Sequence, residues 1–160
     1  MHALTAEHAA SVLANASAAD LRVFTVPTAF YLYDWDHHDF AGFTDASDHH
    51  RGYLFADIDG QTRGIVMRAA STTSRARSGL CDLCHAMQPG AQVTMFTARR
   101  AGDAGERGDS VGVYACADLT CHDNVRLALP LAPGEFRADV GVRIDETARR
   151  VHAFMRRVLA

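Results

Sequence analysis

Residues 81–84 read Cys-Asp-Leu-Cys and residues 116–121 read Cys-Ala-Asp-Leu-Thr-Cys, and these two short stretches decide the fold. A C-x2-C turn presents two sulfur atoms from one loop, and a second close pair can supply two more. Four thiolates fill the tetrahedral shell that zinc prefers and leave no open position for a reactive water. The spacing therefore predicts one structural zinc ion with four cysteine ligands: Cys81, Cys84, Cys116 and Cys121.

The segments around the cysteines predict a treble-clef zinc finger. Val93 to Ala98 and Val111 to Ala115 are apolar runs that favour two strands, and Asp118 to Leu129 favours a helix. Cys116 then ends the second strand, and Cys121 lies in the first turn of the helix. A C-x2-C turn, called the zinc knuckle, followed by a hairpin and a helix makes a treble clef. Zinc is expected to supply free energy on the order of 10 kcal/mol to such a unit.

Four other interpretations of the cysteines stay open on the sequence alone. Residues 81–85 match the C-x-x-C-H haem-attachment pattern, but that attachment takes place outside the cytoplasm and leaves Cys116 and Cys121 without a role. A thioredoxin-like redox pair needs a βαβ context that the surrounding pattern does not offer. The cysteines could be buried without a shared role, and His85 or His122 could replace one of them as a ligand.

Three elements outside the cysteine region have clear patterns. Asp59-Gly60 separates Gly52–Ile58 from Thr62–Ala69, which predicts a β-hairpin because glycine accepts a positive φ. Thr5 to Ala18 predicts a helix with Thr5 as its cap. Asp145 to Leu159 predicts an amphipathic helix that carries arginines on its outer face.

The remaining segments are expected to be short or irregular. Residues 30–33 are interpreted as a short strand or turn, and residues 34–51 mostly as a loop. Further connections are expected at 99–110 and 132–139.

The polar stretch 71–79 is the best candidate for an internal boundary. It divides an N-terminal helix and hairpin region, 1–75, from a treble-clef region with the C-terminal helix, 76–160. We expect the two regions to form one compact unit. The predicted fold class is α+β, with an antiparallel sheet, a treble-clef zinc finger and a few flanking helices.

Composition limits the class of protein. The chain of 160 residues is 48% hydrophobic and 22% charged, as is ordinary for a soluble globular domain. No apolar run approaches the roughly 18 residues needed to span a bilayer, so no membrane partner is expected. The N-terminal segment lacks the basic start and apolar centre of a signal peptide. These features predict a cytoplasmic protein, in which reduced thiols favour a metal over disulfides.

Charge is unevenly distributed along the chain. Residues 1–60 hold nine acidic residues and two arginines, whereas residues 61–160 hold ten acidic residues and fourteen arginines. A mildly basic half can favour an acidic partner, but this excess is too small for a typical DNA-binding domain. DNA is therefore not an expected partner.

The connection from Arg99 to Ser110 is the candidate binding loop. Guanidinium groups form paired hydrogen bonds to carboxylates and phosphates, and the glycines of this stretch permit unusual dihedral angles. The alternative is a solvated hairpin tip whose arginines pair with the acidic residues Asp103, Glu106 and Asp109. We take four arginines as candidate partner contacts: Arg99, Arg100, Arg107 and Arg126.

A second concentration of possible metal ligands lies within residues 34–50. Imidazole and carboxylate groups together can hold zinc, nickel or iron if they converge in space. One alternative function is therefore a metal-dependent enzyme that needs His37 or His49, and the other interpretation is a solvated acidic loop. The residues in question are Asp34, Asp36, His37, His38, Asp39, Asp48, His49 and His50.

Several motifs match a known family. They are Cys81-x-Leu-Cys84, Phe96-Thr-Ala-Arg-Arg-Ala-Gly102, Gly108-Asp-Ser-Val-Gly-Val-Tyr114, Cys116-Ala-Asp-Leu-x-Cys121 and Arg126. With these motifs, residues 81–126 resemble the C-terminal treble-clef domain of the elongation-factor-G-binding proteins, the family of the FusB-type fusidic acid resistance proteins. A weaker similarity upstream, which includes Leu13–Ser17 and Arg51–Leu54, extends the resemblance to roughly residues 5–130.

The resemblance implies a non-enzymatic protein that binds elongation factor G or the ribosome. Resistance members help the factor to leave a ribosome stalled by fusidic acid. They place a helical domain before the zinc domain, whereas this chain is expected to be a stand-alone second domain, so resistance itself is not predicted. Resistance members use one histidine ligand, whereas the C-x4-C pair makes four cysteines the simpler set here. The other two hypotheses are an RNA-binding zinc finger and the metal-dependent enzyme.

Overall fold

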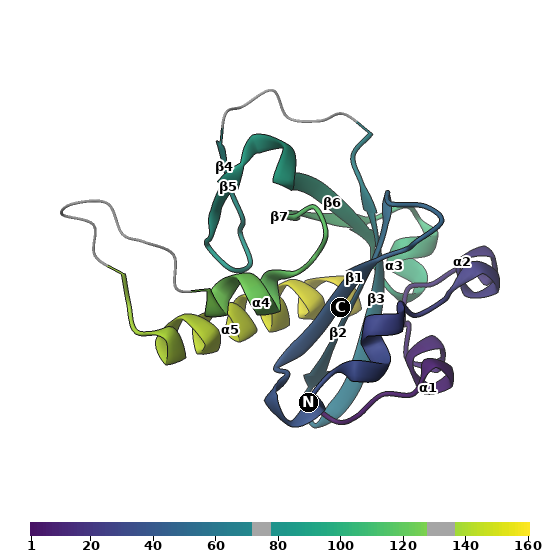
Figure 1. Cartoon of the computed structure of the whole chain (residues 1–160). Coiled ribbons are helices and arrows are strands. Elements are labelled where there is room, and N and C mark those ends of the chain that lie inside the picture. The colour runs from purple at the N-terminus through teal and green to yellow at the C-terminus, as the bar shows by residue number, and fades with distance from the viewer. Residues whose placement is uncertain (72–77, 128–136) are drawn as a thin grey trace.

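The computed structural model describes residues 1–71, 78–127 and 137–160 (Figure 1). The strands are β1 (Phe40–Thr44), β2 (Arg51–Ile58), β3 (Gln61–Ala69), β4 (Ser78–Leu80), β5 (Met87–Pro89), β6 (Val93–Arg99) and β7 (Ser110–Cys116). The α-helices are α1 (Ala6–Ser11), α2 (Ala18–Val23), α3 (Gly102–Glu106), α4 (Cys121–Arg126) and α5 (Val140–Leu159). Short 3-10 helices are η1 (Thr28–Leu32), η2 (Trp35–His37) and η3 (Gly90–Gln92). The predicted α+β class is confirmed.

Five strands form one antiparallel sheet in the order β1-β2-β3-β6-β7, and β4 pairs with β5 in a separate ribbon. The predicted hairpin is confirmed, because β2 and β3 pair around Asp59 and Gly60, whose φ angles are 53° and 80°. β3 pairs with β6 only at Arg68 and Ala69, so these two strands separate beyond that point. The sheet therefore joins the first half of the chain to the second.

Strand β2, which lies between β1 and β3, is buried on both faces of the sheet. Leu54 and Ala56 pack in a core with the cysteine region and α5, whereas Tyr53 and Phe55 pack in a core with the N-terminal segment. Successive side chains of a strand point to opposite faces, so one strand supports both cores. Figure 1 shows α1 and α2 on one side of the sheet and α4 and α5 on the other.

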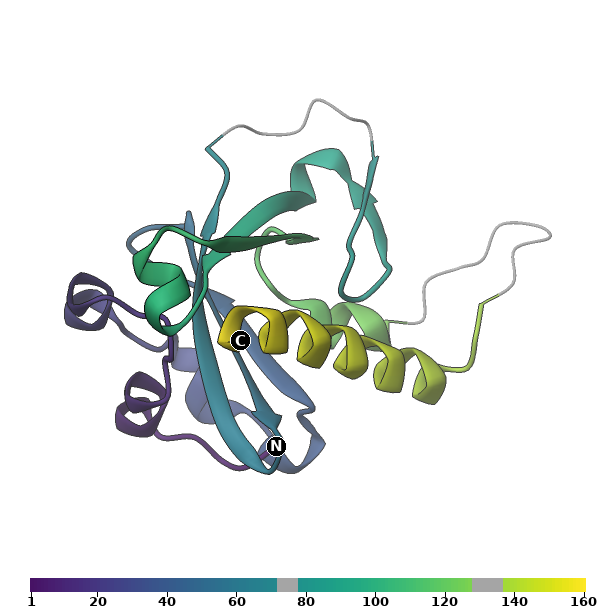
Figure 2. The same cartoon turned by 180° about the vertical axis from the view of Figure 1, so that it is seen from behind.

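Helix α5 covers the side of the sheet on which the cysteines lie (Figure 2). Its largest buried residues recur at helical spacing: Val151, Phe154, Met155 and Val158. The helix begins at Val140 rather than at Asp145, because the Asp139 carboxylate accepts a hydrogen bond from the Gly141 N–H at 2.8 Å and caps the earlier turn.

The predicted helix over residues 5–18 is wrong in its second half. Thr5 does cap α1, but the helix ends at Ser11. The chain then runs beside β3, where the Gly64 N–H donates to the Val12 carbonyl oxygen at 2.9 Å. Residues 12–14 thus form hydrogen bonds with the part of β3 that does not pair with β6. These bonds replace the hydrogen bonds of a longer helix.

The stretch 34–51, expected to be mostly loop, contains strand β1. Residues 40–44 pair along β2, with Phe40 in one core and Phe43 in the other. Residues 30–33 form no strand, since most of them belong to the 3-10 helix η1, which buries Phe30.

The connection between β6 and β7 contains the short helix α3, where a loop was expected. Gly102 and Gly108 have positive φ angles of 62° and 96°, as the glycine pattern suggests. Gly105 is required for a different reason, because a Cβ atom there would lie 1.8 Å from the Arg100 carbonyl oxygen. The Arg100 N–H donates to the Asp109 carbonyl oxygen at 2.9 Å and closes the connection.

Gly105→Ala is expected to destabilise the protein by about 1–3 kcal/mol, because the added methyl group must displace backbone rather than a side chain. Chemical denaturation measures the change, with Ala104→Gly in the same helix as the control. The control removes a methyl group and should cost no more than about 1 kcal/mol. Equal stability of Gly105→Ala and the wild type would contradict the close approach of α3 to Arg100.

Several predicted segments fall partly or wholly outside the described residues. The helix predicted over 118–129 is seen as α4, Cys121–Arg126, and its predicted end lies at undescribed positions. Most of the stretch 71–79, the boundary between residues 75 and 76, and the greater part of the loop 132–139 also lie there. None of the helices in the described part of the chain is long and apolar enough to cross a bilayer.

Candidate metal centre

All four cysteines are buried, and their sulfur atoms lie within 4.8 Å of one another. The Cys81 and Cys121 Sγ atoms are 3.6 Å apart, and those of Cys84 and Cys116 are 3.7 Å apart. Sulfur atoms about 2.3 Å from a central zinc ion define a tetrahedron with edges of about 3.8 Å. The distances fit that tetrahedron and are far longer than the roughly 2.05 Å of a disulfide.

Each cysteine comes from the element that the treble-clef prediction assigned to it. Cys81 and Cys84 lie in the turn between β4 and β5, Cys116 ends β7, and Cys121 begins α4. The knuckle is closed by the His85 N–H, which donates to the Cys81 carbonyl oxygen at 2.9 Å. His85 itself has a φ of 54°, which completes this tight turn.

Polar groups around the sulfur atoms favour thiolates. The Cys84 N–H points to the Cys81 Sγ at 3.4 Å, and the Asn124 side-chain amide donates to the Cys116 Sγ at 3.3 Å. The thiols of Cys116 and Cys121 hold the pKa of Cys81 and that of Cys84 below the ordinary value, because they can donate hydrogen bonds to those thiolates. The pKa of Cys116 and that of Cys121 are raised in turn, because these two thiols keep their protons as the donors. Zinc is bound by thiolates, and a set of four converging cysteine sulfur atoms suits it.

The histidine alternatives do not match the geometry. His85 is exposed and lies outside the group of converging ligand atoms. His122 is turned elsewhere: its Nε2 lies 3.1 Å from the His37 carbonyl oxygen, and its ring stacks on that of His38 with centroids 3.9 Å apart. Four cysteines therefore make up the site.

The family model of the FBP C-terminal treble-clef zinc-finger matches residues 10–158. The chain belongs to this family. Its cysteine cluster is thus the single structural zinc site of a treble-clef domain, which confirms the predicted cofactor. No curated protein and no solved structure matches the chain.

Three of the four candidate contact arginines lie together on the β6–β7 connection of this zinc-finger domain. The side chains of Arg99 and Arg107 are exposed and take part in none of the ion pairs found among the described residues. The Arg100 Nε donates to the Arg157 carbonyl oxygen at 3.1 Å, which ties the connection to the end of α5. The acidic residues of the connection do not pair with these arginines, in contrast to the solvated-tip alternative.

Arg126 lies apart from them, on α4. Its guanidinium group donates to the Asp39 carboxylate at 2.8 Å and to the carbonyl oxygens of His122 and His37. Arg126 therefore links α4 of the zinc finger to the segment that precedes β1.

The Asp/His stretch does not gather into a second site. Across residues 1–71, 78–127 and 137–160, the cysteine cluster is the only group of three or more potential ligands that converges. Asp34 instead accepts a hydrogen bond from the His37 ring at 2.8 Å, and Asp39 pairs with Arg126. Burial lowers the pKa of His38, which favours the neutral ring in the stack with His122.

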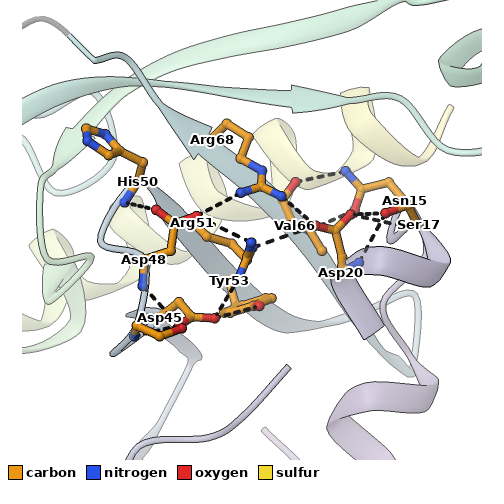
Figure 3. A network of polar contacts seen from close by, with 11 residues as sticks. Asn15, Ser17, Asp20, Asp45, Asp48, His50, Arg51, Tyr53, Val66 and Arg68 are labelled. Carbon is orange, nitrogen blue, oxygen red and sulfur yellow. Dashed lines mark hydrogen bonds and ion pairs between the residues drawn. The ribbon is translucent and has the colours of Figure 1, made fainter. Parts of the chain in front are cut away.

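A network of ion pairs surrounds Arg51 and could not be predicted from residue spacing (Figure 3). The Arg51 guanidinium lies 3.0 Å from Asp45 and 3.3 Å from Asp48, and its Nε lies 3.7 Å from Asp20. Arg68 pairs with Asp20 at 2.6 Å and with Asp48 at 3.1 Å. The network joins α2, the loop after β1, β2 and β3, so it fixes the N-terminal segment to the sheet.

Asn15 is a second polar residue whose role only the structure reveals. Its side-chain amide donates to the carbonyl oxygens of Val66 and Arg99 at 2.9 and 2.7 Å, and its oxygen accepts from the Val66 N–H at 2.7 Å. The amide thus bridges β3 and β6 where the two strands separate. This contact fixes the carbonyl end of Arg99, the first residue of the candidate binding loop.

Proposed function

We propose that this zinc-finger domain is a non-enzymatic binding module of the translation machinery, and that its partner is elongation factor G. The motifs of residues 81–126 support the choice of partner through their resemblance to the elongation-factor-G-binding proteins. Membership of the zinc-finger family supports a binding role rather than a catalytic one. The structural zinc then holds the binding surface in shape.

The observation that carries the proposal is a pair of exposed arginines, on a fixed connection, whose side chains have no partner among the residues that the structure describes. Arg99 and Arg107 keep their hydrogen-bonding capacity for a carboxylate or phosphate of a partner. The connection is closed by the Arg100 N–H, which donates to the Asp109 carbonyl oxygen at 2.9 Å, and it is tied to α5 by the Ala101 N–H, which donates to the Val158 carbonyl oxygen at 2.8 Å. A surface that is ordered before binding loses less conformational entropy when the partner arrives.

Arg100 lies between these two arginines and contributes to the same surface. Arg126 already has three internal acceptors, so we assign it to the support of α4 rather than to the partner. Figures 1 and 2 show that α3 and α4 lie at different parts of the molecule. The proposed contact set is therefore Arg99, Arg100 and Arg107.

Arg99→Ala combined with Arg100→Ala is expected to weaken binding to purified elongation factor G at least tenfold, because a central arginine in an interface often contributes more than about 1.4 kcal/mol. Isothermal titration calorimetry at moderate salt measures the change. Arg149→Ala, which removes an exposed arginine from the outer face of α5, is the control and should bind as the wild type does.

Three results of this titration would contradict the proposal in different ways. Unchanged affinity of the double variant would exclude the loop as the contact surface. Absence of binding by the zinc-loaded wild type would exclude elongation factor G as the partner. Binding of RNA alone, with an affinity that falls steeply as salt is raised, would identify the domain as an RNA-binding module instead.

A further inference from the structure

Strand β7 lies at the edge of the five-stranded sheet, and among the described strands of that sheet it pairs with β6 alone. Odd-numbered residues direct their backbone groups to β6: the Arg100 N–H donates to the Asp109 carbonyl oxygen and the Ala117 N–H to the Gln92 carbonyl oxygen, both at 2.9 Å. Backbone groups alternate along an antiparallel strand. Those of the even-numbered residues Ser110, Gly112 and Tyr114 therefore point away from the sheet.

At Tyr114 this outer edge is already paired in the manner of a strand. The Tyr114 N–H donates to the Asp82 carboxylate at 2.9 Å, and the Asp82 N–H donates to the Tyr114 carbonyl oxygen at 2.8 Å. The zinc knuckle thus occupies the position of a sixth strand at one point. This shows that the edge can accept a neighbour.

The next outward groups along β7 have no such neighbour. Ser110 and Gly112 are both exposed, and no loop or side chain of the described residues bonds to their backbone groups. The side chains of Val113 and Ala115 lie on one face of β7 and are buried in the core, which holds the strand in place. Most proteins protect such an edge, because a row of free N–H and C=O groups is a template for another chain.

Arg107 offers one cationic contact beside this edge, which is otherwise flanked by the acidic residues Asp109 and Asp82. Arg107, which precedes β7, is exposed and forms none of the ion pairs found in the described part of the chain. The opposite end of the edge is closed by Asp82 of the zinc knuckle. A partner strand therefore has room beside Ser110 and Gly112 and a cationic group near one end.

We infer that β7 binds a short extended segment of the partner as a sixth strand. The segment exchanges backbone hydrogen bonds with Ser110 and Gly112, and a carboxylate on it pairs with Arg107. Addition of a strand to a sheet edge gives affinity through the main chain and leaves specificity to a few side chains. This inference rests on the proposed function, since it describes how the partner is held.

Gly112→Pro tests the inference, because proline removes the outward N–H and is tolerated where an edge-strand N–H faces solvent. Affinity for elongation factor G is expected to fall at least tenfold. Ser110→Ala is the control, because it changes a side chain and keeps every backbone group, and its affinity should match that of the wild type. Zinc content and circular dichroism show whether each variant keeps the native fold.

Hydrogen exchange on the wild type gives a second readout that needs no substitution. The amides of Ser110 and Gly112 should exchange rapidly in the free protein and at least tenfold more slowly in the complex. Those of Val111 and Val113, which pair with β6, should be protected in both states.

Each remaining outcome overturns a different statement. Binding of the factor with unchanged exchange at Ser110 and Gly112 would overturn the sixth strand and leave the proposed function standing. Absence of binding would overturn the proposed function and the inference with it. Slow exchange in the free protein together with a dimer by light scattering would mean that a second copy occupies the edge, which also overturns the inference.

Discussion

Cys81→Ser is expected to lose zinc and to unfold the treble clef. Removal of one thiolate from a closed four-sulfur site forfeits much of a binding free energy on the order of 10 kcal/mol. Domains of this size are stable by only about 5–15 kcal/mol, so the variant should lack a cooperative native state. Metal analysis together with thermal unfolding measures both effects, and the expected zinc content is well below one ion per chain.

His85→Ala is the matched control for this experiment. His85 adjoins the knuckle but is exposed, and its ring lies outside the ligand group. The variant should keep one zinc ion per chain. Alanine at this position of positive φ should have only a small effect on stability. If Cys81→Ser kept full zinc and native stability, the four-cysteine site would be wrong.

Asp45→Asn is expected to destabilise the protein by about 3 kcal/mol. The Asp45 side chain is only 1% exposed and accepts hydrogen bonds from Ser47 and Arg51, with the Tyr53 hydroxyl at 3.3 Å. Loss of the carboxylate leaves Arg51, itself 13% exposed, with less compensation for its burial. Chemical denaturation of zinc-loaded protein measures the difference, and Asp59→Asn is the control. Asp59 forms an exposed pair with Arg156, which solvent screens, so its substitution should change stability far less.

The difference in unfolding free energy between the wild type and Asp45→Asn should depend on pH in a defined direction. Burial alone would raise the pKa of Asp45. The hydrogen bonds from Ser47 and the charge of Arg51 outweigh burial and lower the pKa of Asp45 from 3.8 to about 2. A lowered carboxyl pKa stabilises the fold above the unfolded-state value, and this contribution is lost only as the pH falls through about 4 towards 2. The difference between wild type and Asp45→Asn should therefore stay constant from pH 8 to pH 5. A change within that window would point to histidines instead.

Local chemistry made part of the fold predictable. The two cysteine pairs could be interpreted from spacing alone, because zinc fixes the geometry of its ligands whatever surrounds them. The β2–β3 turn was predictable for a similar reason, since Asp59-Gly60 supplies the positive φ angles that the turn needs.

Features that depend on distant partners were not predictable. Residues 12–15 have a helical pattern, yet they pair with β3 because that strand separates from β6. Strand β1 is short and lies in a polar stretch, and only its pairing with β2 defines it. The acidic residue Asp48 looked like a metal ligand, but Arg51 and Arg68 neutralise it from two neighbouring strands. No spacing rule relates these residues, since the fold alone brings them together.

X-ray absorption at the zinc edge of the purified protein tests the central claim most directly, because it reports the ligands of the ion that holds the binding domain together. The predicted result is one zinc ion per chain, surrounded by four sulfur atoms at about 2.3 Å. A nitrogen or oxygen ligand in that shell, or a second bound metal ion, would contradict the account.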